Sequence, residues 1–287
     1  MEPTVATEGR EPFHWRTAIS YKTKDKIVVR GYDLDDLTGN ISFAEMAYLV
    51  WRGELPSAAH GRMLDAILVS MAEHAFSPSS AASRFVTSGG VPLHVGVAGG
   101  MLAIGSVHGT ADRPAELFRD AVAQMRREGL TTEEAARRVA GDARRAGRRL
   151  PGFHHPQHIQ DPRTARLLGL ADGWGVSGAH VAMARAIESA TEEFWGRRIF
   201  LNGPGAVGAI CLDMGFDIEL IKGVFLLSRT VSLVAHTYEE AQREKGWRGS
   251  TNARIVQPLD LSLQRPEFYD GPPDREFPRD RRRGAQY

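Results

Sequence analysis

Apolar and polar residues alternate only near the start of this chain. Over residues 15–29 the alternation has a period of two, and Ile27-Val28-Val29 follows a charged turn at residues 24–26. A period of two is typical of a β-strand, so this segment predicts a small β-hairpin. From residue 33 onward the apolar residues recur with helical spacing instead.

Helix signals dominate the rest of the chain. Ser42 followed by Glu45 forms a capping box, and Gly53 and Pro56 mark the end of the helix that it opens. Further helices are expected over residues 57–75, 92–104, 113–149 and 181–194, in a segment ending near 214, and over 218–240. The fold class predicted is therefore all-α with a minor N-terminal β-hairpin.

Two helical segments and the C-terminal tail differ in composition from the rest. Residues 92–104 are rich in glycine and alanine, which predicts close packing against a neighbouring helix or a second copy of the chain. Residues 113–149 are charged and amphipathic, and their arginine pairs either meet a phosphate-bearing ligand or form a solvated helix face. The tail at 265–287, rich in proline and arginine, is expected to be extended or disordered, or to lie over a partner subunit.

The overall composition narrows the function classes. Of 287 residues 42% are apolar, which can build a core, and the formal charge of +1 gives no electrostatic reason to expect a nucleic-acid partner. The single cysteine, Cys211, lies in an apolar run and is expected to be a buried, inert thiol, as suits a reducing cytoplasm. No secretion signal or bilayer-spanning segment is recognisable, so a cytoplasmic protein without a membrane partner is predicted.

Candidate chemistry comes from histidines in glycine- or proline-flanked contexts. His74, His108 and His155 lie far apart in the sequence, and imidazole titrates near neutral pH, so together they indicate an acid/base or oxyanion-binding site. The cluster His154-His155-Pro156-Gln157-His158 also permits a metal site. Because Pro156 prevents a regular helix through the cluster and no acidic residue follows at the spacing of a zinc-protease helix, no metal is expected.

A series of short motifs resembles the citrate synthase and citryl-CoA lyase superfamily over roughly residues 16–245, and the short length resembles its citryl-CoA lyase-like bacterial members. These motifs, in chain order, are Thr17-Ala18-Ile19-Ser20, Val29-Arg30-Gly31-Tyr32-Asp33-Leu34-Asp35-Asp36-Leu37, Ser42-Phe43-Ala44-Glu45, Trp51-Arg52-Gly53-Glu54-Leu55-Pro56, Glu73-His74, Ser77-Pro78-Ser79, Gly105-Ser106-Val107-His108-Gly109, Pro151-Gly152-Phe153-His154-His155, Asp161-Pro162-Arg163, Ser228-Arg229-Thr230 and Ala235-His236. The number and order of these motifs carry the resemblance.

The resemblance implies an almost wholly helical, two-domain fold and an obligate homodimer. The large domain, which carries the dimer contacts, would comprise residues 1–110 and 205–287, and the small domain residues 111–204. It also implies an enzyme that joins a CoA thioester to a 2-oxo acid, or cleaves their adduct, without a metal. Arg248 and Arg254 are the residues expected to reach a neighbouring subunit's site.

Site residues follow from the same resemblance. His108 would polarise the thioester carbonyl, and His155 would donate to the ketone oxygen of the oxo acid. The oxo acid would also be held by His74, and its carboxylates by Arg163 and Arg229, since a guanidinium group binds a carboxylate through two parallel hydrogen bonds. Asn202 is assigned to substrate binding, and Gly152 and Phe153 to the CoA thioester.

The sequence departs from the family pattern at two places. The family has an aspartate base in an Asn-Val-Asp-Gly type turn, but here the turn reads Asn202-Gly203-Pro204-Gly205, so proline occupies the position of the base. Either Asp161 or Asp213 is a conceivable substitute, although Asp213 lies far along the next helix. The second departure is His154, which stands where the family usually has glycine and is a candidate catalytic base.

Three functions therefore stay open. The first is a citryl-CoA lyase or citrate synthase-like enzyme that makes or cleaves a carbon–carbon bond between a CoA-thioester enolate and a 2-oxo acid. The second is a thioester hydrolase, decarboxylase or retro-aldolase on the same scaffold, and the third is a catalytically silent ligand-binding homologue.

Overall fold

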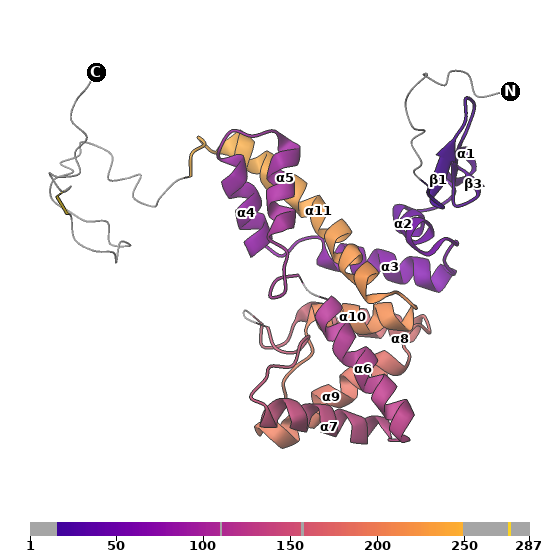
Figure 1. Ribbon diagram of the computed structural model, residues 1–287, viewed down its shortest axis with the longest axis vertical. Coiled ribbons are helices and arrows are strands. Elements are labelled where there is room, and N and C mark those ends of the chain that lie inside the picture. The colour runs from indigo at the N-terminus through magenta and orange to yellow at the C-terminus, as the bar shows by residue number, and fades with distance from the viewer. Residues whose placement is uncertain (1–15, 110, 156–157, 249–274, 277–287) are drawn as a thin grey trace.

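A computed structural model describes residues 16–109, 111–155, 158–248 and 275–276 (Figure 1). The predicted tail at 265–287, apart from residues 275 and 276, lies outside the described residues, and so does Arg254. Among the described residues, no helix is both long and apolar enough to cross a bilayer.

The N-terminal hairpin is confirmed and gains a third strand. Strands β1 (Ser20–Lys22), β2 (Ile27–Val29) and β3 (Tyr32–Asp33) form an antiparallel sheet in the order β1-β2-β3, with Tyr21 opposite Val28. The turn between β2 and β3 consists of Arg30 and Gly31, whose φ angles of 49° and 90° are both positive. Two consecutive positive φ angles match the twist of a two-residue hairpin, which explains how β3 pairs so soon after β2.

The remaining described elements are α-helices, which confirms the predicted all-α class. They are α1 (Leu34–Leu37), α2 (Phe43–Arg52), α3 (Ala58–Met71), α4 (Pro78–Thr87), α5 (Leu93–Leu102), α6 (Asp112–Glu128), α7 (Thr132–Arg145), α8 (Pro162–Gly173), α9 (Ala179–Trp195), α10 (Gly203–Asp213) and α11 (Ile218–Arg243). The capping box at the start of α2 forms as predicted, because the Ser42 side chain accepts from the Glu45 amide and Glu45 accepts from the Ser42 amide. The helix then ends at Gly53, in a left-handed conformation.

Close packing explains the glycines of α5. A Cβ atom on Gly100 would come within 2.9 Å of the Ser79 carbonyl oxygen of α4 and 2.7 Å of Leu233 of α11. Only glycine permits this approach, so the packing predicted for residues 92–104 is found against two neighbouring helices. These three helices lie together in the upper middle of Figure 1.

Helix α10 is the most deeply buried helix among those described, and it packs against α6, α8 and α9. Its Cys211 is fully buried, and burial raises the pKa of this thiol to about 12, in agreement with the inert thiol expected from the sequence. The tight contact continues at Gly208, where a Cβ atom would lie 2.6 Å from the Ala111 carbonyl oxygen. Helices α6 to α10 form the lower group in Figure 1, while the division of the chain into a large and a small domain stays a prediction.

Candidate active site

A cavity of about 290 Å³ lies where the loops before α4, α6 and α8 meet the start of α10 and the middle of α11. It brings together most of the residues proposed from the sequence, although they come from segments far apart in the chain. Its walls contain His74, Phe76, Ser77, Pro78, Val107, His108, Gly109, Gly152, His155, Arg163, Asn202, Pro204, Phe225 and Arg229. His154 and Phe153 do not line this cavity.

His108 is held in one orientation by the start of α4. The backbone N–H of Ser79 donates to His108 Nε2 over 3.3 Å, and the Ser79 hydroxyl lies 2.9 Å from the same nitrogen. A backbone N–H can only donate, so Nε2 is the acceptor and the neutral ring carries its proton on Nδ1. Burial, with Arg229 and His74 adding smaller effects, lowers the pKa of His108. The ring is therefore a neutral hydrogen-bond donor near neutral pH.

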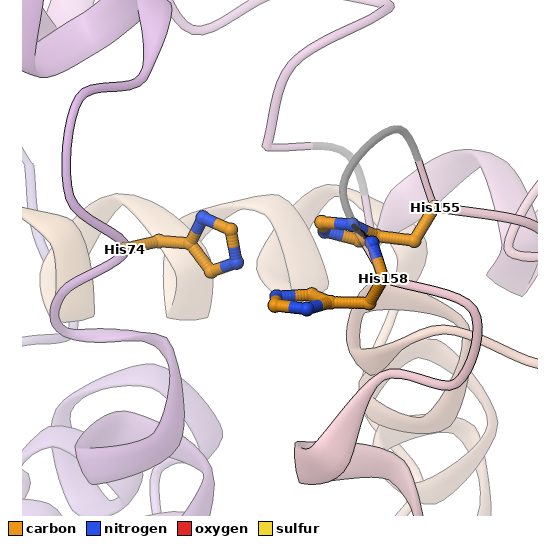
Figure 2. Close-up of side chains that lie close together, drawn as sticks. All are labelled: His74, His155 and His158. Carbon is orange, nitrogen blue, oxygen red and sulfur yellow. Dashed lines mark hydrogen bonds between the residues drawn. The ribbon is translucent and has the colours of Figure 1, made fainter.

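His155 is oriented in a similar way by its own loop. The His158 amide donates to His155 Nδ1 over 3.1 Å, which places the proton of the neutral ring on Nε2. Burial is the largest cause of the lowered pKa of His155, and burial followed by Arg163 and Arg229 lowers the pKa of His74. The rings of His74 and His155 lie close together, with centroids 5.2 Å apart and ring planes inclined at 53° (Figure 2).

Arg229 is the most unusual charged residue of the cavity. It lies on α11, is only 2% exposed, and has its guanidinium carbon 5.1 Å from the centre of the Phe225 ring. Its Nε and Nη1 atoms are buried without a hydrogen-bond partner among the described residues. Burial lowers the pKa of Arg229, yet an arginine stays charged in proteins. Unpartnered buried donors are costly, so Arg229 indicates an anionic ligand.

Arg163 differs from Arg229 because it already has a carboxylate partner. Its Nε and Nη2 atoms donate to the two oxygens of Asp161 over 2.9 and 2.7 Å. Asp161 also caps α8 and accepts from the Gly203 amide over 2.8 Å. Although burial opposes ionisation, these bonds hold the pKa of Asp161 well below its usual range. Such a stabilised carboxylate is a weak base.

Asn202 and Pro204 form the start of α10. Asn202 caps the helix by accepting from the Gly205 amide over 2.9 Å, and its Nδ2 donates to the His154 carbonyl over 2.7 Å. Both ends of the amide are thus engaged within the protein, although the residue lines the cavity. Pro204 lines the cavity with no proton-accepting group.

Asp213 lies at the opposite end of α10 and does not line the cavity. It is bound by His180 over 2.8 Å and by the amides of Gly178 and Val181. Asp213 is therefore engaged within the protein and lies outside the cavity.

A second hollow of about 290 Å³ is lined by other residues of the loop that contributes Gly152 and His155 to the cavity. It is lined by Ala143, Arg144, Gly147, Arg148, Arg149, Leu150, Phe153, His154, Trp195, Arg197 and Ile199. Phe153 is largely buried and packs edge-on against Phe118, whereas His154 is exposed with a φ of 67°. The remaining arginines of α7 pair with carboxylates instead, as Arg137 does with Glu193.

Two contributors to the site were not assigned by the sequence analysis. Ser79 belongs to the motif Ser77-Pro78-Ser79, but its contact with His108 depends on the packing of distant segments. His158 was considered only together with His154 and His155. In the structure its ring centroid lies 4.5 Å from that of His155 and 5.6 Å from that of His74.

Comparison with known proteins identifies this architecture. Residues 56–250 match the family model described as citrate synthase, C-terminal domain. The chain belongs to the citrate synthase family. The matched segment includes each of the cavity histidines and arginines described above.

Similarity to solved structures extends over nearly the whole chain. Citryl-CoA lyase from Hydrogenobacter thermophilus is 35% identical with a TM-score of 0.79, and the match covers 93% of this chain and 98% of that one. ATP citrate lyase from Methanosaeta concilii, solved as a D541A mutant with (3S)-citryl-CoA, has a TM-score of 0.71 at 19% identity, covering 90% of this chain and 44% of that chain. At that identity the second likeness shows the fold alone.

Curated relatives are longer than this chain. Putative citrate synthase 2 of Mycobacterium tuberculosis is 29% identical over 239 residues, which cover 77% of this chain and 57% of that protein. The glyoxysomal citrate synthase of Cucurbita maxima is 28% identical, with coverage of 70% and 40% respectively. The chain therefore spans about half the length of the curated relatives it matches.

Proposed function

We propose that this protein is a citryl-CoA lyase-like enzyme that makes or cleaves the carbon–carbon bond between a CoA-thioester enolate and a 2-oxo acid. The observation that carries the proposal is Arg229, a buried guanidinium group with unpartnered donors in a cavity that also contains two oriented, neutral imidazoles. The 35% identical citryl-CoA lyase, matched over almost its full length, supports the same reaction class.

The charged arginines would bind the carboxylate of the substrate, and the neutral histidines would bind its reacting oxygens. A carboxylate of the oxo acid would bind Arg229, with the donors of Arg163 that Asp161 leaves unused at its side. His155 would donate from Nε2 to the oxygen that is a ketone in one direction and an alkoxide in the other. His108 would donate from Nδ1 to the thioester oxygen, on which negative charge develops as the carbon–carbon bond breaks. Each fixed hydrogen-bond donor of this kind increases the reaction rate by a factor of about 10²–10³.

Proton transfer at the α-carbon is the weak step of this mechanism. Pro204 supplies no base, and Asp161 is committed to Arg163 and the Gly203 amide. This observation favours a second candidate, in which the same donors assist thioester hydrolysis, decarboxylation or retro-aldol cleavage without α-proton abstraction. A catalytically silent homologue would also bind an anionic ligand through Arg229, but it would have less use for the oriented hydrogen-bond donors of His108 and His155, which disfavours it.

We assign the arginine-lined hollow to the phosphate-bearing end of the CoA thioester. Arg144, Arg148 and Arg197 surround it, and Trp195 supplies aromatic surface for a base to stack on, while the largely buried Phe153 forms part of the wall. Gly152 lines the main cavity while Phe153 lines this hollow, so one loop would contact both ends of the ligand. No metal ion takes part in these steps.

A second copy of the chain is the partner we propose. Large apolar side chains are exposed on the group α4, α5 and α11, including Phe85 at 63%, Leu102 at 87% and Val231 at 67%. Burial of such a surface stabilises association, so a homodimer through these helices is expected. The cytoplasm, predicted from the cysteine content, is the compartment we assign to it.

A thermal-shift screen of CoA thioesters, with and without 2-oxo dicarboxylates, tests the proposal. A ligand that binds only the native state raises the melting temperature. At a ligand concentration of 100 times Kd, binding stabilises the native state by about 2.7 kcal/mol. We expect shifts from a thioester and a dicarboxylate, with the dicarboxylate shift lost in Arg229→Met. Arg243→Met, an exposed arginine of the same helix, is the matched control. Absence of any thioester shift would contradict the assignment.

A further inference from the structure

Glu73 and His236 lie in contact, and the proposed reaction gives neither of them a role. Glu73 precedes His74 in the loop after α3, and His236 belongs to α11. His236 Nε2 lies 3.4 and 3.3 Å from the two carboxylate oxygens of Glu73, although 163 residues separate them in the chain. The side chain of His236 is only 15% exposed, whereas that of Glu73 is half-exposed. The contact is therefore made by the fold and not by local sequence.

Arg84 fixes the orientation of the His236 ring from its other side. The Nη1 atom of Arg84 lies 3.5 Å from His236 Nδ1, and an arginine can only donate, so Nδ1 is the acceptor. The proton of the neutral ring is then on Nε2, which faces Glu73. Arg84 is itself held by the buried carboxylate of Glu240, which accepts from Arg84 Nε over 2.8 Å and also from Arg248. A network on α4 and α11 thus supports the donor that faces Glu73.

The loop that contains Glu73 runs beside the face of α11 that contains Arg229. Arg229 and His236 are seven residues apart, which places them on one face of the helix, about 10 Å from each other along its axis. At the Arg229 end, the Ser228 hydroxyl donates to the Leu68 carbonyl in the last turn of α3. At the other end, the loop reaches His236 through Glu73. The Glu73 carboxylate therefore lies near a buried cation.

The charge of Glu73 acts on Arg229 without a hydrogen bond from Nε or Nη1. Burial lowers the pKa of Arg229, and the Glu73 carboxylate opposes this effect by raising it. Yet Nε and Nη1 of Arg229 have no hydrogen-bond partner among the described residues. Opposite charges attract strongly where water is excluded, so a nearby carboxylate is drawn to a desolvated guanidinium. A restraint must hold Glu73 back, and the His236 Nε2–H is the donor in place to do so.

We propose that His236 is a positioning residue that holds the Glu73 carboxylate away from Arg229, so that the Arg229 donors stay free for the carboxylate of the substrate. The negative charge still lies near enough to stabilise the buried cation. This inference goes beyond the proposed reaction but rests on its assignment of a substrate carboxylate to Arg229. Without the restraint, Glu73 would bind Arg229 and compete with the substrate from within the protein.

Isothermal titration calorimetry of the full-length protein with oxaloacetate, a 2-oxo dicarboxylate, tests the restraint. His236→Leu keeps an apolar contact with Phe76 but loses the donor, so binding should weaken by about ten- to a hundredfold, the contribution of one charge-assisted hydrogen bond. His236→Gln can still donate to Glu73 and should bind like wild type. The double variant with His236→Leu and Glu73→Gln has no competing charge and should recover to within about threefold of wild type. His94→Leu, at an exposed histidine of α5, is the matched control.

A merely structural role of His236 predicts a different result, because a second substitution would not reverse a loss of local order. Equal binding by His236→Leu and wild type, or a double variant as weak as His236→Leu, overturns the inference.

A crystal structure of ligand-free His236→Leu gives a readout that needs no substrate. A carboxylate oxygen of Glu73 should lie within about 3.2 Å of Arg229 Nε or Nη1. A Glu73 side chain that stays clear of Arg229 in this variant also overturns the inference. A wild type that binds no oxaloacetate contradicts the proposed function instead, and the crystal structure then decides the role of His236 by itself.

Discussion

Restoring a carboxylate at position 204 is the sharpest change that the site suggests. Pro204 is the second residue of α10, half-buried in the cavity wall, where the resemblance places the family's aspartate base. Pro204→Asp should therefore restore removal of a proton from the α-carbon of a CoA thioester. General-base catalysis contributes about 10²–10⁴ in rate, which corresponds to roughly 2.7–5.5 kcal/mol of activation free energy.

The substitution should leave the fold intact. Loss of proline increases the conformational entropy of the unfolded chain and so destabilises the fold by about 0.4–1 kcal/mol. A carboxylate in the first turn of a helix stabilises the fold by about 0.3–1 kcal/mol through the helix dipole. These changes nearly cancel, and the Asn202 cap of α10 does not involve Pro204. The melting temperature should thus shift by only a few degrees.

The assay is exchange of the acetyl-CoA methyl protons in heavy water, followed by NMR. Wild type should exchange slowly and Pro204→Asp about 10²–10⁴ times faster. Pro204→Asn, which has the same shape but no base, should resemble wild type. The reasoning fails if wild type already exchanges as fast as Pro204→Asp, or if the aspartate and asparagine variants are equal.

Three further predictions concern charge in and around the cavity. Arg229→Met removes a buried guanidinium without a partner, so dicarboxylate binding should be lost while the melting temperature does not fall. A clear drop of the melting temperature in calorimetry would show that Arg229 has a structural partner. Asp161→Asn leaves Arg163 without its buried carboxylate and should cost about 3–5 kcal/mol in urea unfolding, whereas a loss below 1 kcal/mol would contradict the pairing. The pKa values of His74, His108 and His155 are lowered in the folded state, so the unfolded state binds more protons at mildly acidic pH. The free energy of unfolding should therefore decline as the pH falls below about 6.5. A free energy of unfolding that stays constant between about pH 7.5 and 5.5 would refute this prediction.

Much of the fold followed from residue patterns, because the signals that set it are local. Ser42 and Glu45 cap α2 through bonds within one turn, and glycine spacing in α5 reflects the two helices that pack on it. Strand β3 was not anticipated, since its pairing depends on the conformation of Arg30 and Gly31 rather than on alternation.

The site was only partly predictable. Motif order named His108, His155 and Arg229, and the absence of a base at Pro204 was visible in the sequence. The sequence did not reveal which side chains already have a hydrogen-bond partner. The pairing of Asp161 with Arg163 and the orientation of the imidazole rings arise from tertiary contacts. The meeting of His74 with His158 had no sequence signal for the same reason.

The most direct test of the central claim is product analysis after incubation with citryl-CoA. Mass spectrometry should detect acetyl-CoA and the 2-oxo acid in equal amounts, with formation at least about 10²-fold slower in His108→Ala. Release of free CoA and citrate, or no turnover at all, would contradict carbon–carbon bond cleavage at this site.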